Sequence, residues 1–325
     1  MESRNLLRAS LAIAVALGCT RDATAQAYPA RPITMIVPNP AGGPMDTVAR
    51  IIAERVRAAL GQSIIIENVP GASGSIGTGR VARAAGDGYT LSLGGWSQFV
   101  ANGAVYALNY ELVKDFEPIM LVATQPLLLV GNKSISAKNL TELIAWLKAR
   151  PDKAWQGTGG HLDHVAGVLF QKETGTRFGF VPYRGINQAM QDLVGSQIDL
   201  MIATAPISLP AMQAGSINAY AVTAKSRLAI APNIPTMDEA GVLGLHFSSW
   251  QALWAPKGTP KDLITKLNAI VVDALADPVV RQRLADLGQE IFPREQQTPE
   301  ALGWFQKKEI EKWWPIIKEA GLKPE

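Results

Sequence analysis

The chain has 325 residues, of which 47% are hydrophobic and 18% are charged, and its formal net charge is +3 at pH 7. This composition is typical of a globular protein, and the length is enough for two domains of roughly 150 residues each. The small net charge and the absence of a run of Lys and Arg argue against a nucleic-acid-binding surface.

The N-terminal segment has the pattern of a cleaved secretory signal peptide. Arg4 and Arg8 precede an apolar run, residues 9–18, that is too short to span a bilayer as a helix. Ala25 and Ala27 then occupy the small-x-small positions that a signal peptidase accepts. We therefore predict cleavage after Ala27 and export of the remainder of the chain.

A lipoprotein anchored through Cys19 is the alternative for this segment. Cys19 is the only cysteine of the chain, but Leu17 lies one place too close to it for the usual lipobox. After cleavage at Ala27 no cysteine remains, so the exported protein cannot rely on disulfides and depends on its hydrophobic core.

Predicted strands and helices alternate along most of the remaining chain. An apolar run over 33–38 leads through Gly42 and Gly43 into a periodic apolar segment, which is the pattern of a strand, a turn and a helix. Further strands are predicted over 63–69, 89–95, 126–132, 178–185, 198–204 and 220–226, and helices over 78–85, 136–150 and 186–195 and directly after Gly160. From Pro260 onward the pattern is mostly helical, with a break at 276–280. The alternation predicts an α/β architecture with mainly parallel strands.

The chain is expected to form two domains that no linker separates. No low-complexity segment divides the sequence. Two domains without a linker are often joined by crossing strands, and one of them is then discontinuous in sequence. We place the two crossings near residues 128 and 247.

The sequence lacks the signatures of common enzymes. It contains no G-x-S-x-G, P-loop or H-E-x-x-H, and GTGRVA at 77–82 matches a dinucleotide-binding pattern but follows a loop instead of a strand. His161 and His164 are close in sequence, but the third histidine, His246, is remote and no other ligand accompanies the pair. Few groups suited to acid–base or nucleophilic catalysis are present. We predict that the protein is not an enzyme and holds no metal and no cofactor.

Three glycine-rich turns, at 38–46, 70–77 and 157–164, point to binding instead. In an open α/β sheet such turns lie at the carboxyl ends of strands, where ligands bind. Glycine lets the backbone approach a ligand, and each helix start offers unpaired N–H groups and the positive end of a dipole. The turns therefore predict an anion such as a carboxylate in a cleft between the domains, although any single turn could contain glycine only to reverse the chain.

Several segments, taken in order, resemble one known family. They are YPARPITMIVPNPAGGPMDTVARIIAERV, GQSIIIENVPGASGSIGTGRVARAAGDGYTL, KDFEPI, VPYRGINQAMQDLVGSQIDLM, NIPTMDEAG and SSWQALWAPKGTP. Together they resemble the substrate-binding proteins of tripartite tricarboxylate transporters, the Bug family of Gram-negative bacteria, from Tyr28 to the C-terminal AGLKP. The resemblance implies an α/β, two-lobed periplasmic-binding-protein fold (type II-like) with the ligand cleft between the lobes. Lobe 1 would comprise residues 28–128 and 248–325, and lobe 2 residues 129–247.

The resemblance also implies a function. A protein of this family is a periplasmic receptor that closes on a small carboxylate, here a di-, tri- or aromatic carboxylic acid, and delivers it to integral-membrane permease subunits. A receptor that feeds a sensor kinase is the nearer alternative, and a periplasmic enzyme is the more remote one. We expect a monomer with no nucleic-acid partner.

The family's ligand loops can be placed on this sequence residue by residue. In the family, the first βα loop and the glycine loop after the second strand hold one carboxylate through backbone groups. Asp46 is expected to cap the helix that follows the first loop, and Arg184 to face solvent. With the loops of lobe 2, and with three residues (Trp96, His161 and Thr204) that depart from the family pattern, we predict the ligand-binding set Ala41, Gly42, Gly43, Ala72, Ser73, Gly74, Trp96, Ser97, Thr158, Gly160, His161, Tyr183, Gly185 and Thr204.

Three features, at four positions, depart from the family pattern. His161 stands where the family has Ser or Thr, and it either donates to a carboxylate or lies exposed at a helix start. Trp96 replaces a small residue, and it either stacks on an aromatic acid or packs inside the protein. Ala203 and Thr204 stand where the family has an acidic residue, which argues against an amino-acid ligand.

Overall fold

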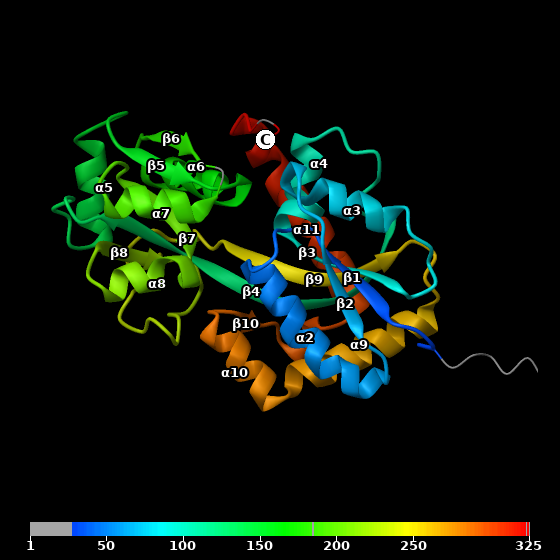
Figure 1. The fold of residues 1–325 in the computed structure, drawn as a ribbon. Helices are drawn as coiled ribbons and strands as arrows, with labels where there is room; N and C mark the ends of the chain where they lie inside the picture. The colour runs from blue at the N-terminus through cyan, green and yellow to red at the C-terminus, as the bar shows by residue number, and fades with distance from the viewer. Residues whose placement is uncertain (1–27, 184, 323, 325) are drawn as a thin grey trace, which may run out of the picture.

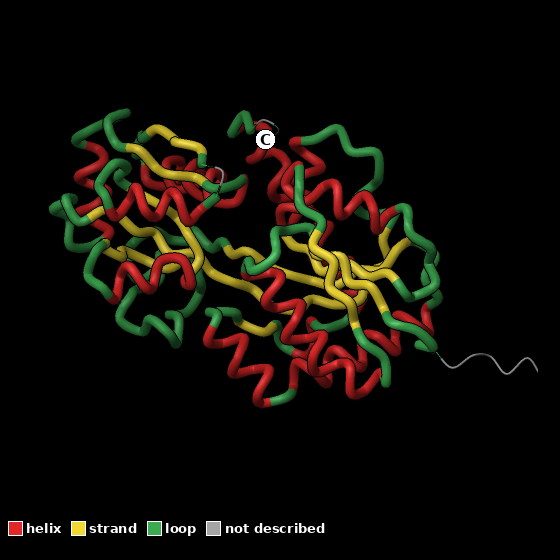
Figure 2. Tube along the Cα trace, viewed as in Figure 1, coloured by secondary structure: helices red, strands yellow, loops and turns green. Residues whose placement is uncertain are grey.

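The computed structural model describes residues 28–183, 185–322 and 324. The predicted signal peptide, with Cys19, and Arg184 lie outside the described residues. Figure 1 shows two α/β lobes joined by the long strands β4 (Phe116–Asn132) and β9 (Ser248–Pro256). Each lobe has its strands inside and its helices outside (Figure 2).

The helices and strands divide between the lobes as follows. Lobe 1 begins with β1 (Ile33–Val37), α2 (Pro44–Leu60), β2 (Ile64–Asn68), η1 (Ala72–Gly74), α3 (Ser75–Ala82), β3 (Thr90–Gly95), the π-helical turn η2 (Ser97–Ala101) and α4 (Asn102–Val105). Lobe 2 contains α5 (Leu140–Lys148), β5 (Trp155–Thr158), α6 (His161–Thr174), β6 (Gly179–Pro182), α7 (Ile186–Val194), β7 (Leu200–Thr204), α8 (Ala205–Gln213) and β8 (Ile217–Val222). After β9 the chain completes lobe 1 with α9 (Lys261–Ala276), α10 (Pro278–Asp286), β10 (Glu290–Ile291), η3 (Arg294–Gln296) and α11 (Pro299–Glu319). The predicted break at 276–280 is confirmed, because it separates α9 from α10.

The strands form one mixed ten-stranded sheet in the order β2-β1-β3-β9-β4-β7-β5-β6, with β8 and β10 also paired to β4. Pairing is parallel between β1 and its neighbours β2 and β3, and between β5 and its neighbours β6 and β7. Strands β4 and β9 pair antiparallel, because β4 carries the chain out of lobe 1 and β9 brings it back. The prediction of mainly parallel strands is therefore wrong for the strands that join the lobes.

Strand β4 belongs to the sheets of both lobes. Its residues up to Pro126 pair with β9, and those from Leu127 onward pair with β7 and β8. The lobe boundaries near residues 128 and 247 lie close to this change of partner and to the start of β9. We keep those boundaries as a proposal.

Helix α2 illustrates why these segments become helices. Gly43 caps its start, Pro44 occupies the first turn without leaving an unpaired N–H, and Gly61 ends it in the left-handed conformation at φ 65°. Val48 and Ile52, four residues apart, lie on its buried face. Among the residues that the structure describes, no helix is both long and apolar enough to cross a membrane.

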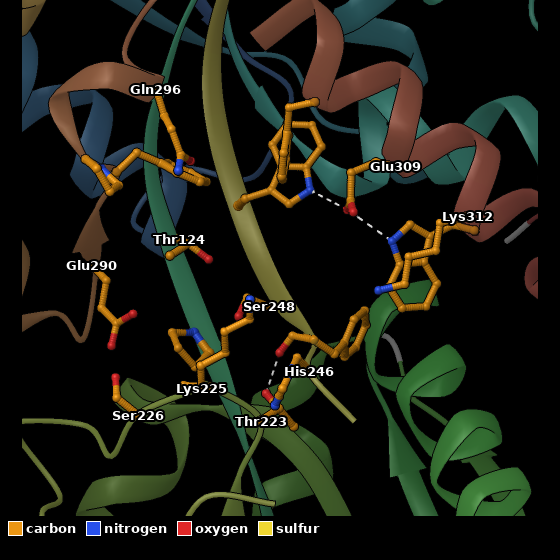
Figure 3. A pocket seen from close by; sticks show the side chains of 18 residues that line it. Thr124, Thr223, Lys225, Ser226, His246, Ser248, Glu290, Gln296, Glu309 and Lys312 are labelled. Carbon is orange, nitrogen blue, oxygen red and sulfur yellow. Dashed lines mark hydrogen bonds between the residues drawn. The ribbon is translucent and has the colours of Figure 1, made fainter. Parts of the chain in front are cut away.

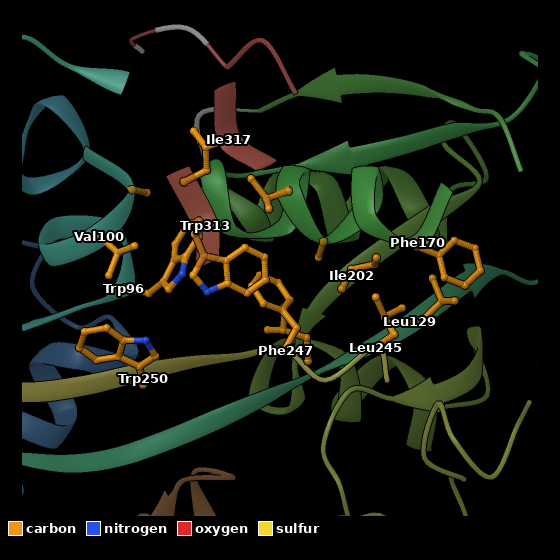
Figure 4. Packing of buried hydrophobic residues seen from close by; sticks show 14 of the residues in the cluster. Trp96, Val100, Leu129, Phe170, Ile202, Leu245, Phe247, Trp250, Trp313 and Ile317 are labelled. Atoms are coloured by element: carbon orange, nitrogen blue, oxygen red, sulfur yellow. The ribbon is translucent and has the colours of Figure 1, made fainter. Parts of the chain in front are cut away.

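Buried hydrophobic side chains form three clusters. One fills lobe 1 between the sheet and the helices α2 and α9, and another lies in lobe 2 around β7 and β8. The third runs from lobe 1 into lobe 2 and includes Trp96, Trp250, Trp313 and Phe170 (Figure 4). In this shared cluster, side chains of α11 pack with side chains of the crossing strands β4 and β9.

Candidate ligand site

A cavity of about 210 Å³ lies where the two lobes meet. Lobe 1 contributes Ser97 at the start of η2, the crossing strand β4 contributes Leu127, and lobe 2 contributes residues from the ends of β5 and β7 and from the starts of the helices that follow. The lining residues are Ser97, Leu127, Gly159, Gly160, His161, Leu162, Asp163, Ile186, Ile202, Ala203 and Thr204. The cavity thus occupies the carboxyl edge of the sheet, where open α/β folds bind ligands.

Three helix N-termini border this cavity. Helix α6 begins at His161, α7 at Ile186 and α8 directly after Thr204, and all three residues line the cavity. Each start has unpaired N–H groups and the positive end of a dipole equivalent to about half a charge. No Lys or Arg occurs among the described residues that line the cavity, so within this lining the helix starts are the groups that can attract an anion. Such a site favours an anion.

The glycine turns ahead of α2 and α6 are built alike. The N–H of Gly42 donates to Asp46 Oδ2 over 2.8 Å, and the N–H of Gly159 donates to Asp163 Oδ2 in the same way. In both turns the sequence is Gly-Gly-x-x-Asp, and the aspartate is the third residue of the helix. Asp46 therefore fixes the turn ahead of α2 and does not cap the helix as expected, because the N-cap is Gly43 and the N–H that Asp46 accepts belongs to Gly42. The N–H of Gly42 is consequently engaged within the protein, and contact of the other backbone groups of this turn with a ligand stays a prediction.

The Asp46 carboxylate is held ionised by its neighbours. It is 3% exposed and also accepts a hydrogen bond from Arg50 Nε over 3.0 Å. Burial on its own would raise the pKa of Asp46, but the hydrogen bonds from Arg50, the Gly42 N–H and Asn68 outweigh burial and lower the pKa. The first turn therefore carries a fixed negative charge beside its helix start.

The second glycine turn has an unusual backbone. Residues 71–74 have φ angles of 117°, 47°, 49° and 86°, and two of them, Ala72 and Ser73, are not glycine. A non-glycine residue in the left-handed region costs roughly 1–2 kcal/mol, and it persists where its surroundings hold it. Here the carbonyl of Ser73 accepts hydrogen bonds from Gln98 Nε2 over 3.2 Å and from Asn102 Nδ2 over 3.1 Å.

Ser97 and Trp96 lie side by side in sequence but have different surroundings. Ser97 lines the cavity from lobe 1. Trp96 is 1% exposed, and its ring packs edge-on against Trp313 and Phe247 at centroid distances of 5.7 and 6.0 Å (Figure 4). Of the two alternatives for Trp96, packing inside the protein describes its position, because the covered ring offers no face for stacking on a ligand.

Three predicted ligand residues of lobe 2, Thr158, Tyr183 and Gly185, do not line the cavity, although residues close to them in the sequence do. Thr158 is buried at the end of β5, and Gly185 caps α7. The hydroxyl of Tyr183 donates to Asp192 Oδ2 over 2.7 Å, so it points back to α7. Burial, together with this carboxylate, raises the pKa of Tyr183 to about 12.

His161 faces the cavity and the opposite lobe. It is 4% exposed, and the centroid of its ring lies 6.0 Å from that of Tyr106 in lobe 1. The alternative of an exposed histidine therefore does not match its position. His164 stacks on Phe180 at a centroid distance of 4.0 Å, and burial, with a smaller contribution from His161, lowers the pKa of His164.

A second, larger cavity of about 490 Å³ lies against the crossing strands (Figure 3). Thr124 of β4 and Ser248 of β9 line it, and the carboxylate of Glu309 in α11 accepts the indole N–H groups of Trp250 and Trp313, each over 3.0 Å. None of the predicted ligand residues lines this larger cavity, and it is not at the helix starts. We therefore place the candidate site in the smaller cavity. Within the described ranges, no group of three or more His, Cys, Asp and Glu could hold a metal ion.

Comparison with known proteins identifies the family. The profile of the "Tripartite tricarboxylate transporter family receptor" matches residues 48–322. The chain belongs to this family. The resemblance inferred from the sequence is thus confirmed, and so is the two-lobed α/β fold of a periplasmic binding protein.

Solved structures of similar proteins share the fold over nearly their whole length. The periplasmic binding protein BugD is 37% identical, with a TM-score of 0.79 over 92% of this chain and 100% of its own. Rpa4515 of R. palustris, solved with adipate, is 33% identical, with a TM-score of 0.81 over 92% and 100% of the two chains. MatC of Rhodopseudomonas palustris, solved with bound malate, is 36% identical, with a TM-score of 0.78 over 89% and 100%.

The structure brings together part of the ligand set predicted for this tripartite tricarboxylate receptor. Four of the predicted residues line the cavity: Ser97, Gly160, His161 and Thr204. The turns 41–43 and 72–74 lie in lobe 1, outside the lining. Their contact with a ligand stays a prediction.

Sequence reasoning missed the polar side chains that support these turns. Gln98 and Asn102 are 3% and 0% exposed, and both donate to the second glycine turn. The available signal was a pair of amide residues, Gln98 and Asn102, that are four apart and begin three residues after a strand that ends in two glycines. A single sequence gives no means of telling whether such side chains face solvent or the interior.

Proposed function

We propose that this chain is a periplasmic solute-binding protein that captures a small dicarboxylic or related carboxylic acid between its lobes. The ligand is held mainly by backbone N–H groups at the helix starts. The single observation that carries the proposal is the interlobe cavity bordered by three helix N-termini, with no Lys or Arg among the described lining residues. The malate and adipate bound by similar proteins support this ligand class.

The magnitudes are compatible with this proposal. Hydrogen bonds to a charged group are worth about 1.5–3 kcal/mol each, and micromolar affinity requires about 8 kcal/mol. Four or five such bonds reach that order before the cost of association is subtracted. Apolar contact with Leu127, Ile186 and Ile202 in the cavity wall adds to the total.

We further propose that the protein is exported with cleavage after Ala27, remains a monomer and delivers its ligand to a tripartite tricarboxylate-type permease. Delivery to a sensor kinase is the alternative partner. A gene for two-component signalling beside this one, without genes for membrane subunits, would favour the alternative. Purified permease that binds the ligand-loaded receptor would favour transport.

Thermal unfolding of residues 28–325 with a panel of carboxylic acids tests the ligand class. Malate, adipate, citrate and benzoate are matched with their uncharged amides as controls. A ligand present at 100 times its Kd adds about 2.7 kcal/mol to the free energy of unfolding, which gives a clear rise in Tm. We expect a rise with at least one acid and none with its amide. A panel in which only amides or neutral sugars raise Tm would refute a carboxylate site.

A further inference from the structure

Gln98 lies where three segments of lobe 1 come together. Its side chain is 3% exposed and belongs to the π-helical turn η2. Its Oε1 accepts the N–H of Gly95 over 3.1 Å, and its Nε2 donates to Asn39 Oδ1 over 3.4 Å and to the Ser73 carbonyl over 3.2 Å. One amide therefore connects the end of β3 with the turns that follow β1 and β2.

The surroundings of Gln98 are fitted to this side chain. A Cβ atom added at Gly74 would lie 2.7 Å from Gln98 Nε2 and 2.7 Å from the Pro38 carbonyl oxygen, and Gly74 has a φ of +86°. The second turn can approach both Gln98 and the first turn only because this position is glycine. The close approach and the hydrogen bond to the Ser73 carbonyl involve the same Nε2 atom and describe one arrangement.

Other polar groups hold the same turn from the same side. Asn102, one helical turn after Gln98, donates to the Ser73 carbonyl over 3.1 Å, and the Tyr106 hydroxyl donates to Ser73 Oγ over 3.3 Å. The left-handed conformations of Ala72 and Ser73 are thus stabilised from η2 and the short helix after it. Ser97, the neighbour of Gln98, lines the cavity. The same short element therefore supports the turns and contributes to the candidate site.

We propose that Gln98 is a positioning residue for ligand binding. It fixes the 38–46 and 70–77 turns relative to each other and to Ser97 before the ligand arrives. Preorganised loops lower the entropic cost of binding, so the loss of this amide should weaken the affinity without removing any group that touches the ligand. The inference rests on the proposed function for its ligand, but the positioning of the turns can be measured without one.

Three variants separate positioning from general stability. Gln98→Met keeps the length of the side chain and removes all of its hydrogen bonds. Gln98→Glu keeps the acceptor for Gly95 and sets a carboxylate against the Ser73 carbonyl. Gln297→Met is the matched control, because Gln297 is also buried, at 6% exposure, and its side-chain Nε2 donates to the Phe292 carbonyl over 2.6 Å, in a different part of lobe 1.

Calorimetric titration with malate and adipate measures the effect on binding. We expect Gln98→Met to weaken the affinity about tenfold or more, Gln98→Glu to weaken it further, and Gln297→Met to leave it within about twofold of the wild type. A folded Gln98→Met protein with wild-type affinity would overturn the proposal. An equal loss in Gln297→Met would overturn it as well, because general destabilisation would then be sufficient.

Amide hydrogen exchange on the ligand-free proteins measures the turns directly. We expect faster exchange over residues 39–43 and 71–77 together in Gln98→Met, and unchanged exchange there in Gln297→Met. If the wild type binds neither acid but both turns exchange faster, the proposed ligand class fails and the positioning role stands. Unchanged exchange would refute that role. Should Gln98→Met fail to fold, Asn39→Ala removes only the Asn39 contact, and we expect faster exchange over 39–43 with a smaller loss of affinity.

Discussion

Asp46 and Asp163 each lie beside a glycine turn that we predicted to contact an anionic ligand. Each carboxylate takes up the N–H of the glycine four residues earlier and so fixes the turn ahead of its helix. For Asp46 the ion pair with Arg50, 3.0 Å from Nε to Oδ2, compensates the charge. Asp46 therefore restricts its turn without presenting an uncompensated negative charge.

Asp46→Asn tests this role at the level of stability. The folded-state pKa of Asp46 is lowered, so its contribution is present above the unfolded-state pKa and is lost as the pH falls through the folded value. At pH 7 we expect the variant to be less stable by about 1.5–3 kcal/mol, from the loss of hydrogen bonds to a charged group. Urea unfolding at pH 7 and pH 3 measures the difference, which should shrink at the lower pH.

The exposed pair of Glu311 with Lys308 supplies the control for this measurement. Both side chains are more than half exposed, and their N–O distance is 2.7 Å. Glu311→Gln should change the free energy of unfolding by less than about 1 kcal/mol. A loss in Asp46→Asn no larger than in the control would mean that Asp46 does not fix its turn.

At the scale of elements, the second glycine turn shows how tightly a loop can be determined by its neighbours. Its two left-handed non-glycine residues, Ala72 and Ser73, are followed by Gly74, where the chain passes between Pro38 and Gln98. Gly74 must have a positive φ, and there is no room at this position for a Cβ atom. A substitution there should therefore cost more than backbone strain alone.

Gly74→Ala and Gly61→Ala make a matched pair for this expectation. Gly61 also has a positive φ, +65°, but an added Cβ would meet nothing within 4 Å. We expect Gly61→Ala to cost about 1 kcal/mol of unfolding free energy from strain alone. Gly74→Ala should cost about 1–3 kcal/mol more from overpacking, measured by urea unfolding. Equal losses for the two variants would show that the contact with Gln98 relaxes freely.

Much of the arrangement of elements could be predicted from the sequence. Glycine pairs after apolar runs marked the starts of α2 and α6, because glycine turns and helix periodicity are local signals. The π-helical turn and the conformation of Ala72 and Ser73 could not be predicted, since both depend on tertiary hydrogen bonds from η2 and α4. The sequence likewise left two roles open for Trp96, and only three-dimensional packing against Trp313 distinguishes them.

At the scale of the molecule, α11 ties the C-terminal part of lobe 1 to a strand that joins the lobes. Glu309 of α11 accepts the indole N–H of Trp250 in β9, and Trp313 donates to the same oxygen. Burial raises the pKa of Glu309, and the two indoles and Lys312 offset only part of that effect. The junction therefore contains a carboxylate whose charged form is disfavoured.

Glu309→Gln should show a pH dependence opposite in sign to the one expected for Asp46→Asn. A carboxyl group whose folded-state pKa is raised stabilises the fold below its unfolded-state pKa, and this contribution is lost as the pH rises through the folded value. Glutamine stays neutral and can still accept one indole N–H. We expect the variant to gain stability relative to the wild type, by the order of 1 kcal/mol, between pH 4.5 and pH 7. Thermal unfolding across this range checks it, and a constant difference would contradict a raised pKa.

The place of β9 in the sheet imposes an order on folding. It lies between β3 and β4, so the sheet of lobe 1 stays open until the chain has returned from lobe 2. A growing chain that has not reached residue 248 leaves the edges of β3 and of the first half of β4 unpaired, and such edges invite aggregation. The strands of lobe 2, in contrast, all lie within one continuous stretch that includes the second half of β4. Lobe 1, which contains the first strands of the chain, can therefore complete its sheet only after the whole of lobe 2 has been synthesised.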